Sequence, residues 1–182
     1  MRLTMHTDYA LRVLMFLGLR PGALSSIREI AQAYQISENH LVKVVHRLGR
    51  TGMVETVRGR GGGLRLAVPP ERIRLGDVVR LTEESLAPVE CFTARGEPEP
   101  RAGAGGGPAA GCVIAGPCGL QRVLHEALRA YMAVLDRATL GDLLGGRCGA
   151  LAGRLGVALV PDAPAAGGAA GPAADRAGRR RW

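Results

Sequence analysis

Apolar positions in the first half of the chain recur at helical spacing and stop at glycine or proline. The pattern predicts a first helix from about Asp8 to Pro21, and a capping-box signature places a second, short helix at about 26–34. Ser37 is positioned to cap a third helix. The inner face predicted for that third helix is Leu41, Val44, Val45 and Leu48. Two short helices joined by a turn of three or four residues are typical of a helix-turn-helix.

Two β-like segments follow, at 53–57 and 64–68, joined by the glycine-rich stretch 58–63. A glycine-rich connection between two short strands predicts a hairpin. A helix-turn-helix followed by a basic hairpin is a winged helix, and the segment 75–84 predicts one more helix. The expected fold is therefore mainly α with a small β-hairpin.

The second half changes in composition. Residues 93–111 are rich in Gly, Pro and Ala, which predicts a flexible insertion, and residues 161–182 have the same character and predict a disordered tail. A long helix is expected over 119–138. The expected domains are a winged helix-turn-helix at 1–80, a cysteine-bearing loop with a dimerisation helix at 81–145, and a C-terminal extension at 146–182.

The long helix has an apolar stripe, for which two interpretations stay open. The stripe either packs back on its own domain or pairs with the same helix of a second copy, giving a homodimer. The predicted interface residues are Leu120, Leu124, Leu128, Tyr131 and Leu135.

Charge and composition limit the kinds of partner that the chain can bind. The net charge of the 182 residues is +8, and residues 1–80 alone hold 13 basic and 6 acidic side chains. A basic domain of this kind indicates a polyanion partner. Aromatic residues make up 3% of the chain, too few for a platform that stacks single-stranded bases.

Neither a signal-peptide core nor an apolar run of membrane-spanning length is found, so we expect a cytoplasmic protein that does not enter the membrane. Phosphate-loop, dinucleotide-binding and nucleophile-elbow motifs are missing, so we expect no enzyme.

The expected partner is a double-stranded DNA operator. In a helix-turn-helix, the start of the second helix meets base edges in the major groove, while wing arginines contact phosphates or the minor groove. The predicted DNA-binding residues are Arg28, Ser37, Glu38, Asn39, His40, Lys43, Arg58 and Arg60.

Four cysteines carry the remaining candidate chemistry. Cys91, Cys112 and Cys118 bracket the insertion, and soft thiolates favour iron–sulfur clusters and zinc. The alternative is that they are unconnected core thiols, since no Cys-x2-Cys pair is present. Cys148 receives no role.

Several motifs together resemble a known family. They are Met1-Arg2-Leu3-Thr4, Thr7-Asp8-Tyr9-Ala10-Leu11-Arg12, Asn39-His40-Leu41-Val42-Lys43, Arg58-Gly59 with Gly62-Gly63 and Leu66, Ile73-Arg74-Leu75-Gly76-Asp77-Val78-Val79, the cysteine pair 112 and 118, and Thr139-Leu140 with Asp142-Leu143. Over roughly residues 1–145 the chain resembles the NsrR group of winged-helix iron–sulfur regulators, a family that also includes IscR and RirA.

This resemblance implies a homodimeric repressor that senses nitric oxide through an iron–sulfur cluster (2Fe-2S or 4Fe-4S), with nitrosylation of the cluster releasing DNA. The implied ligands are Cys91, Cys112 and Cys118. Asp8 of the other subunit is implied as a fourth ligand in some members, and Asp8 as N-cap of the first helix is the alternative. The alternatives for function are an iron- or redox-responsive regulator like RirA or IscR, and a DNA binder with structural zinc.

The chain departs from the family pattern in two places. Twenty residues separate Cys91 from Cys112, where the family has a few. The longer loop costs about 1.2 kcal/mol of extra closure entropy, which thiolate–iron bonds can offset. Gln121 stands where IscR has a histidine.

Overall fold

The computed structural model describes residues 3–98, 114 and 118–160. Its α-helices are α1 (Met5–Gly18), α2 (Ile27–Tyr34), α3 (Glu38–Arg50), α4 (Leu75–Thr82), α5 (Gly119–Arg137), α6 (Leu140–Leu144) and α7 (Cys148–Leu155). A 3-10 turn, η1 (Pro70–Arg72), and a two-stranded antiparallel sheet of β1 (Val54–Val57) and β2 (Gly63–Leu66) complete the fold. The expected mainly α fold with a small hairpin is confirmed. Among the described residues, no helix is both long and apolar enough to cross a membrane.

α1 is the central helix of the molecule. Its buried side chains face several neighbours, because α2, α3, α4, α6 and β2 all contact it. The helix begins at Met5, three residues before the predicted start, because the Thr4 hydroxyl caps it by accepting from the Thr7 amide at 3.4 Å. Asp8 is therefore not the N-cap. It lies in the first turn and pairs with Arg12 at 2.9 Å.

The helix-turn-helix forms as the sequence predicts. The Ser26 hydroxyl accepts from the Glu29 amide, and the Glu29 carboxylate accepts from the Ser26 amide, which completes the capping box. The hydrogen bond from the Ser26 amide to the Glu29 carboxylate lowers the pKa of Glu29. Gln35 ends α2 in the left-handed conformation with φ of 55°, so the chain reverses in the short turn before Glu38. The predicted inner face of α3 is fully buried.

The hairpin extends from the body as a wing. Val54 pairs with Leu66 and Val57 with Gly63, and Ser25 adds a third short edge through two backbone hydrogen bonds to Leu64. A side chain at Gly62 would collide with the Val57 carbonyl, so the turn requires glycine there. The Ser25 bridge fixes the wing to the loop that enters α2.

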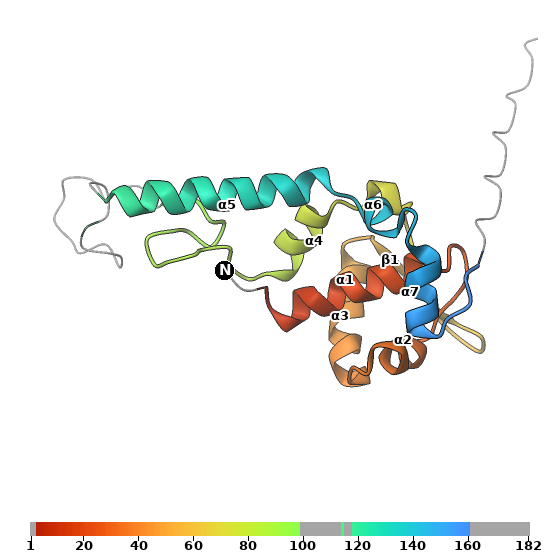
Figure 1. Ribbon diagram of the computed structural model, residues 1–182. Helices are drawn as coiled ribbons and strands as arrows, with labels where there is room; N and C mark the ends of the chain where they lie inside the picture. The colour runs from red at the N-terminus through yellow and green to blue at the C-terminus, as the bar shows by residue number, and fades with distance from the viewer. Residues whose placement is uncertain (1–2, 99–113, 115–117, 161–182) are drawn as a thin grey trace, which may run out of the picture.

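α4 joins the long helix α5 to the rest of the molecule (Figure 1). Leu128 and Met132 of α5 pack with Val79 and Leu86 in a second, smaller core. Arg80 donates two hydrogen bonds to the Asp136 carboxylate, at 2.6 and 2.7 Å, and this contact lowers the pKa of Asp136.

Residues 93–98, the first part of the predicted insertion, form a turn against the same small core. The Thr93 amide donates to the Glu97 carbonyl at 2.8 Å, and the Leu86 amide donates to the Ala94 carbonyl at 2.8 Å. Gly96 is buried, and a side chain there would collide with Leu128. Residues 99–111 of the predicted insertion lie outside the described residues.

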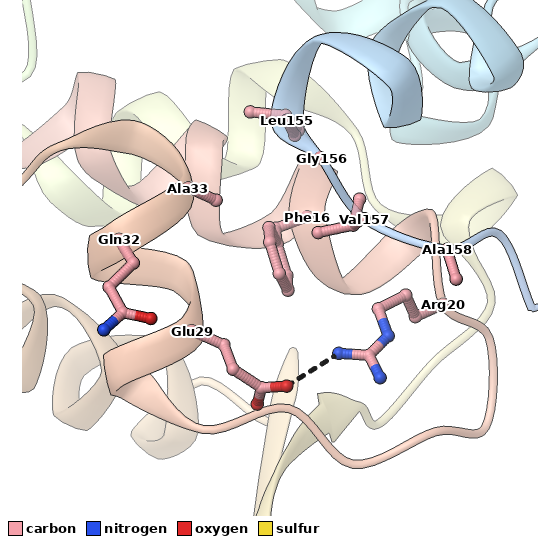
Figure 2. Close-up of a pocket in the computed structure, with 9 residues that line it drawn as sticks. All are labelled: Phe16, Arg20, Glu29, Gln32, Ala33, Leu155, Gly156, Val157 and Ala158. Atoms are coloured by element: carbon pink, nitrogen blue, oxygen red, sulfur yellow. Dashed lines mark hydrogen bonds and ion pairs between the residues drawn. The ribbon is translucent and has the colours of Figure 1, made fainter.

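The chain then returns from α5 to the helix-turn-helix. Thr139 and Asp142 form a capping box at the start of α6. α7, which the sequence pattern does not predict, lies beside α1 (Figure 1), and its Leu151 and Leu155 pack on the main core. Residues 155–158 close over α1 and α2 and leave a pocket of about 410 Å³, in which Arg20 pairs with Glu29 at 3.3 Å (Figure 2). The predicted disordered tail at 161–182 lies outside the described residues.

Gly76→Ala is expected to lower the free energy of unfolding by about 1–3 kcal/mol, because the added methyl would collide with the Asp136 carboxylate and disturb its pair with Arg80. Gly149→Ala on α7 is the matched control, since nothing lies within 4 Å of the added methyl and alanine favours a helix; it should raise stability by up to about 1 kcal/mol. Urea unfolding followed by circular dichroism measures both. Equal effects of the two substitutions would contradict the close α4–α5 contact.

Candidate DNA-binding surface and cysteine pocket

The start of α3 presents a polar face to solvent. Ser37, Glu38, Asn39, His40 and Lys43 are all exposed, as expected of side chains that meet base edges. The His40 ring lies 6.2 Å from the Tyr9 ring of α1, so this side chain leans on the body of the domain. Ser37 is the N-cap residue of α3, and Glu38, Asn39 and Lys43 lie in its first two turns.

The exposed face continues beyond the residues that the sequence pattern selects. His46, Arg47 and Arg50 are also exposed on α3, at helical spacing from Lys43, and that spacing is the signal that could have found them. Burial, together with the positive charge of Arg47, lowers the pKa of His6 on α1. The lowered pKa favours the neutral form of His6 at pH 7.

The wing and α2 add further basic side chains. Arg58 and Arg60 are exposed in the turn of the hairpin, and Arg28 is exposed on α2. Arg65 is different, because it pairs across the strands with Glu55 at 2.8 Å. The two turn arginines, rather than Arg65, are the wing residues free to contact a phosphate backbone.

Two of the three predicted cysteine ligands lie in one small pocket. Cys91, 9% exposed, and the half-buried Cys118 are both free thiols. They line a pocket of about 350 Å³ whose other walls are mostly apolar. The remaining lining residues are Val89, Glu90, Ile114, Leu120, Gln121 and Leu124. Segments that lie far apart in the sequence thus bring their thiols to the same place.

The N-terminus of α5 organises this pocket. Cys118 is the N-cap residue of α5, so the unpaired amides of the first helical turn lie beside it and favour a negatively charged group. The Gln121 side-chain amide donates to the Cys91 carbonyl at 3.0 Å and holds the two segments together. Gln121 therefore has a positioning role that the sequence pattern does not reveal.

The other predicted ligands are placed differently. Cys112 lies outside the described residues, and among those described no group of three Cys, His, Asp or Glu side chains is assembled. Asp8 is on α1, paired with Arg12, and does not line the cysteine pocket. The Cys148 thiol is well apart from it, in a groove between α1 and the base of the wing, and donates to the Leu144 carbonyl at 3.1 Å.

Apolar stripe residues of α5 divide between two environments. Leu128 is buried in the chain's own small core, with Leu135 packed against it. Leu120 and Val134, by contrast, are 62% and 56% exposed. Large apolar side chains left open on α5 are Leu120, Val123, Tyr131 and Val134. Their spacing of three, eight and three residues keeps them on one side of the helix.

Known proteins are similar in sequence to this chain over most of its length. Residues 3–146 match the family model Rrf2, described as an iron-dependent transcriptional regulator. The chain is 54% identical to the HTH-type transcriptional regulator NsrR of Bacillus subtilis (strain 168) over 145 residues, which are 79% of this chain and 90% of that protein. It is 45% identical to protein aau3 of Rhizobium meliloti (strain 1021), over 81% of this chain and 87% of that protein.

Solved structures of regulators share the fold of this chain. CymR, the global cysteine regulator of B. subtilis, superposes with a TM-score of 0.59 at 27% identity, covering 79% of this chain and 95% of that one. IscR of T. potens superposes with a TM-score of 0.57 at 25% identity, covering 79% and 86%. The expectation of a DNA-binding transcriptional regulator rather than an enzyme is confirmed by these relatives. The match to the family model, over most of the chain, shows that this protein belongs to the Rrf2 family of transcriptional regulators.

Proposed function

We propose that this regulator is a homodimeric repressor that acts in the cytoplasm, binds a double-stranded operator and senses nitric oxide through an iron–sulfur cluster. The observation that carries the proposal is the joint placement of Cys91 and Cys118 in one apolar pocket at the start of α5. Thiolate ligands in an apolar setting are typical of iron–sulfur sites. Relatives that bear the name NsrR support the same sensor type.

The proposed ligands are Cys91, Cys112 and Cys118, with Asp8 of the partner subunit as the fourth. Because Asp8 does not line the pocket of its own chain, its use as a ligand would need a second subunit. When bound, the cluster supplies irons with which nitric oxide reacts. Gln121 keeps the Cys91 segment beside the start of α5, next to Cys118.

The pocket is continuous with the proposed dimer interface. Leu120 belongs both to the pocket wall and to the exposed apolar side of α5, together with Val123, Tyr131 and Val134. Several large apolar side chains exposed on one side of a helix are typical of a protein–protein interface. A change at the thiols would therefore shift the dimer helices, and with them the spacing of the two α3 helices on successive major grooves.

An iron-responsive regulator is the second candidate, favoured by the description of the family model as iron-dependent. It uses the same cysteine pocket and DNA surface. The two candidates differ in the signal, so DNA release by nitric oxide, compared with release after iron depletion, separates them.

The cysteines provide the first test of the proposal. Protein purified without oxygen should be coloured, and its visible absorbance should change on addition of nitric oxide. Cys91→Ala, Cys112→Ala and Cys118→Ala should each remove most of the bound iron and the visible absorbance. Cys148→Ala is the matched control, because this free thiol lies in a different groove, and it should retain both. Iron content that is unchanged in Cys118→Ala, or bound zinc in a colourless protein, would overturn the cluster assignment.

DNA binding is tested through its salt dependence. Arg58→Ala or Arg60→Ala should weaken binding of all sequences and lower the slope of log affinity against log salt by about 1 for each phosphate that the protein no longer neutralises. Arg122→Ala, exposed on α5, is the charge-matched control and should leave the slope unchanged. Fluorescence anisotropy over a salt series gives the slopes. The wing would have no role if its variants and the control gave the same slope.

The dimer interface is tested by placing a charge on each side of α5. Val134→Glu should raise the dimer dissociation constant about tenfold or more, because an unpaired carboxylate in an apolar contact is costly. Ala133→Glu, on the adjacent side of the same helix, should leave the dimer intact. Sedimentation velocity over a concentration series reports both. A wild-type protein that is monomeric at all concentrations would contradict the proposed interface.

A further inference from the structure

One apolar side chain interrupts the polar face of α3. Val42 is 51% exposed, whereas the other large apolar residues of this helix are 6% exposed or less. Those buried residues are Leu41, Val44, Val45 and Leu48. Val42 contributes nothing to the core of the domain, so packing within the chain does not explain a valine at this position.

The surroundings of Val42 on the helix are polar and basic. Asn39 precedes it by three residues and His46 follows by four, so all three lie on the same side of α3. Lys43, Arg47 and Arg50 add positive charge to the exposed face. A surface of this charge complements a phosphate backbone better than an apolar protein partner.

Duplex DNA presents one apolar group on its base edges in the major groove, the C5-methyl of thymine. Asn39, beside Val42, has the side chain that pairs bidentately with adenine. Valine in a helix is held almost entirely in one rotamer, so its methyl groups occupy a fixed position on the helix surface. Val42 thus has the chemistry and the rigidity to detect one thymine methyl.

We propose that Val42 reads the C5-methyl group of a thymine in each half-site of the operator. This rests on the proposed function, in which α3 lies in the major groove. Asn39 and Val42 together then select an A·T-containing step, with Asn39 bonding the adenine edge and Val42 contacting the methyl group. Lys43 and the other basic side chains supply affinity that does not depend on this choice.

The test begins with an operator selected from random duplexes by the full-length protein purified without oxygen. Each thymine of the selected site is replaced in turn by deoxyuridine, which removes only the methyl group. At one position in each half-site the replacement should weaken binding of the wild type about three- to fivefold, the loss expected for one buried methyl.

Val42→Ala should weaken binding of the intact operator by a similar factor. Replacement of the critical thymine by deoxyuridine should then cause no further loss of affinity in this variant. Val42→Thr, which keeps one γ-methyl and the β-branched shape, should retain part of the discrimination. Leu159→Ala is the control, because Leu159 is an exposed apolar residue outside α3, and it should respond to deoxyuridine as the wild type does. Circular dichroism confirms that each variant is folded.

The experiment distinguishes failure of the proposed function from failure of the Val42 contact. Wild-type protein that selects no operator overturns the proposed function and this inference with it. The other failure is a wild-type protein that binds a selected operator with the same affinity after deoxyuridine replacement at every position, or that loses affinity at each position by the same factor as Val42→Ala does. Either result overturns only the contact between Val42 and a thymine methyl. The same holds if the selected half-sites contain no thymine.

Discussion

Burial of α1 is the constraint on which the rest of the structure depends. Ala10, Val13, Leu14 and Phe16 have no exposed surface, because the DNA-reading helices cover one side of α1 and the segments that lead to and from α5 cover the other. Interiors packed at crystal-like density transmit displacements rather than absorb them. Neither half of the molecule can move far without moving the helix that both share.

The contacts between α4 and its two neighbours extend this constraint to α5. Arg80, in the last turn of α4, binds Asp136 of α5. Glu83, the C-cap of α4, accepts hydrogen bonds from the hydroxyls of Thr4, the N-cap of α1, and Thr7 in its first turn. Hydrogen bonds to an ionised carboxylate are stronger than neutral ones, so Glu83 holds the end of α4 against the start of α1. The cysteine pocket and the recognition helix are thereby joined through α5, α4 and α1, a physical route from a proposed sensing site to DNA.

α7 and residues 93–98 show where prediction from the sequence failed. α7 contains Gly149 and Gly153, which disfavour a helix in isolation, and its eight residues are too few for a clear periodic signal. The helix forms because Leu151 and Leu155 gain burial against the main core. Likewise, the composition of the segment 93–98 is typical of a loose loop, yet Gly96 fits a buried position beside Leu128 that a residue with a side chain would not. In both cases tertiary packing outweighs local propensity.

Local chemistry alone determined the capping box of α2, the inner face of α3, the glycine-rich turn of the wing and the long helix α5, because their signals lie within a few residues of one another. The basic charge of residues 1–80 likewise indicates a nucleic-acid partner from composition alone. Only the tertiary structure decided that Cys91 and Cys118 share a pocket, and that Leu128 faces inward while Leu120 remains open. The reason is that spacing along a helix fixes which residues share a side, whereas the neighbour that covers that side comes from a distant segment of the chain.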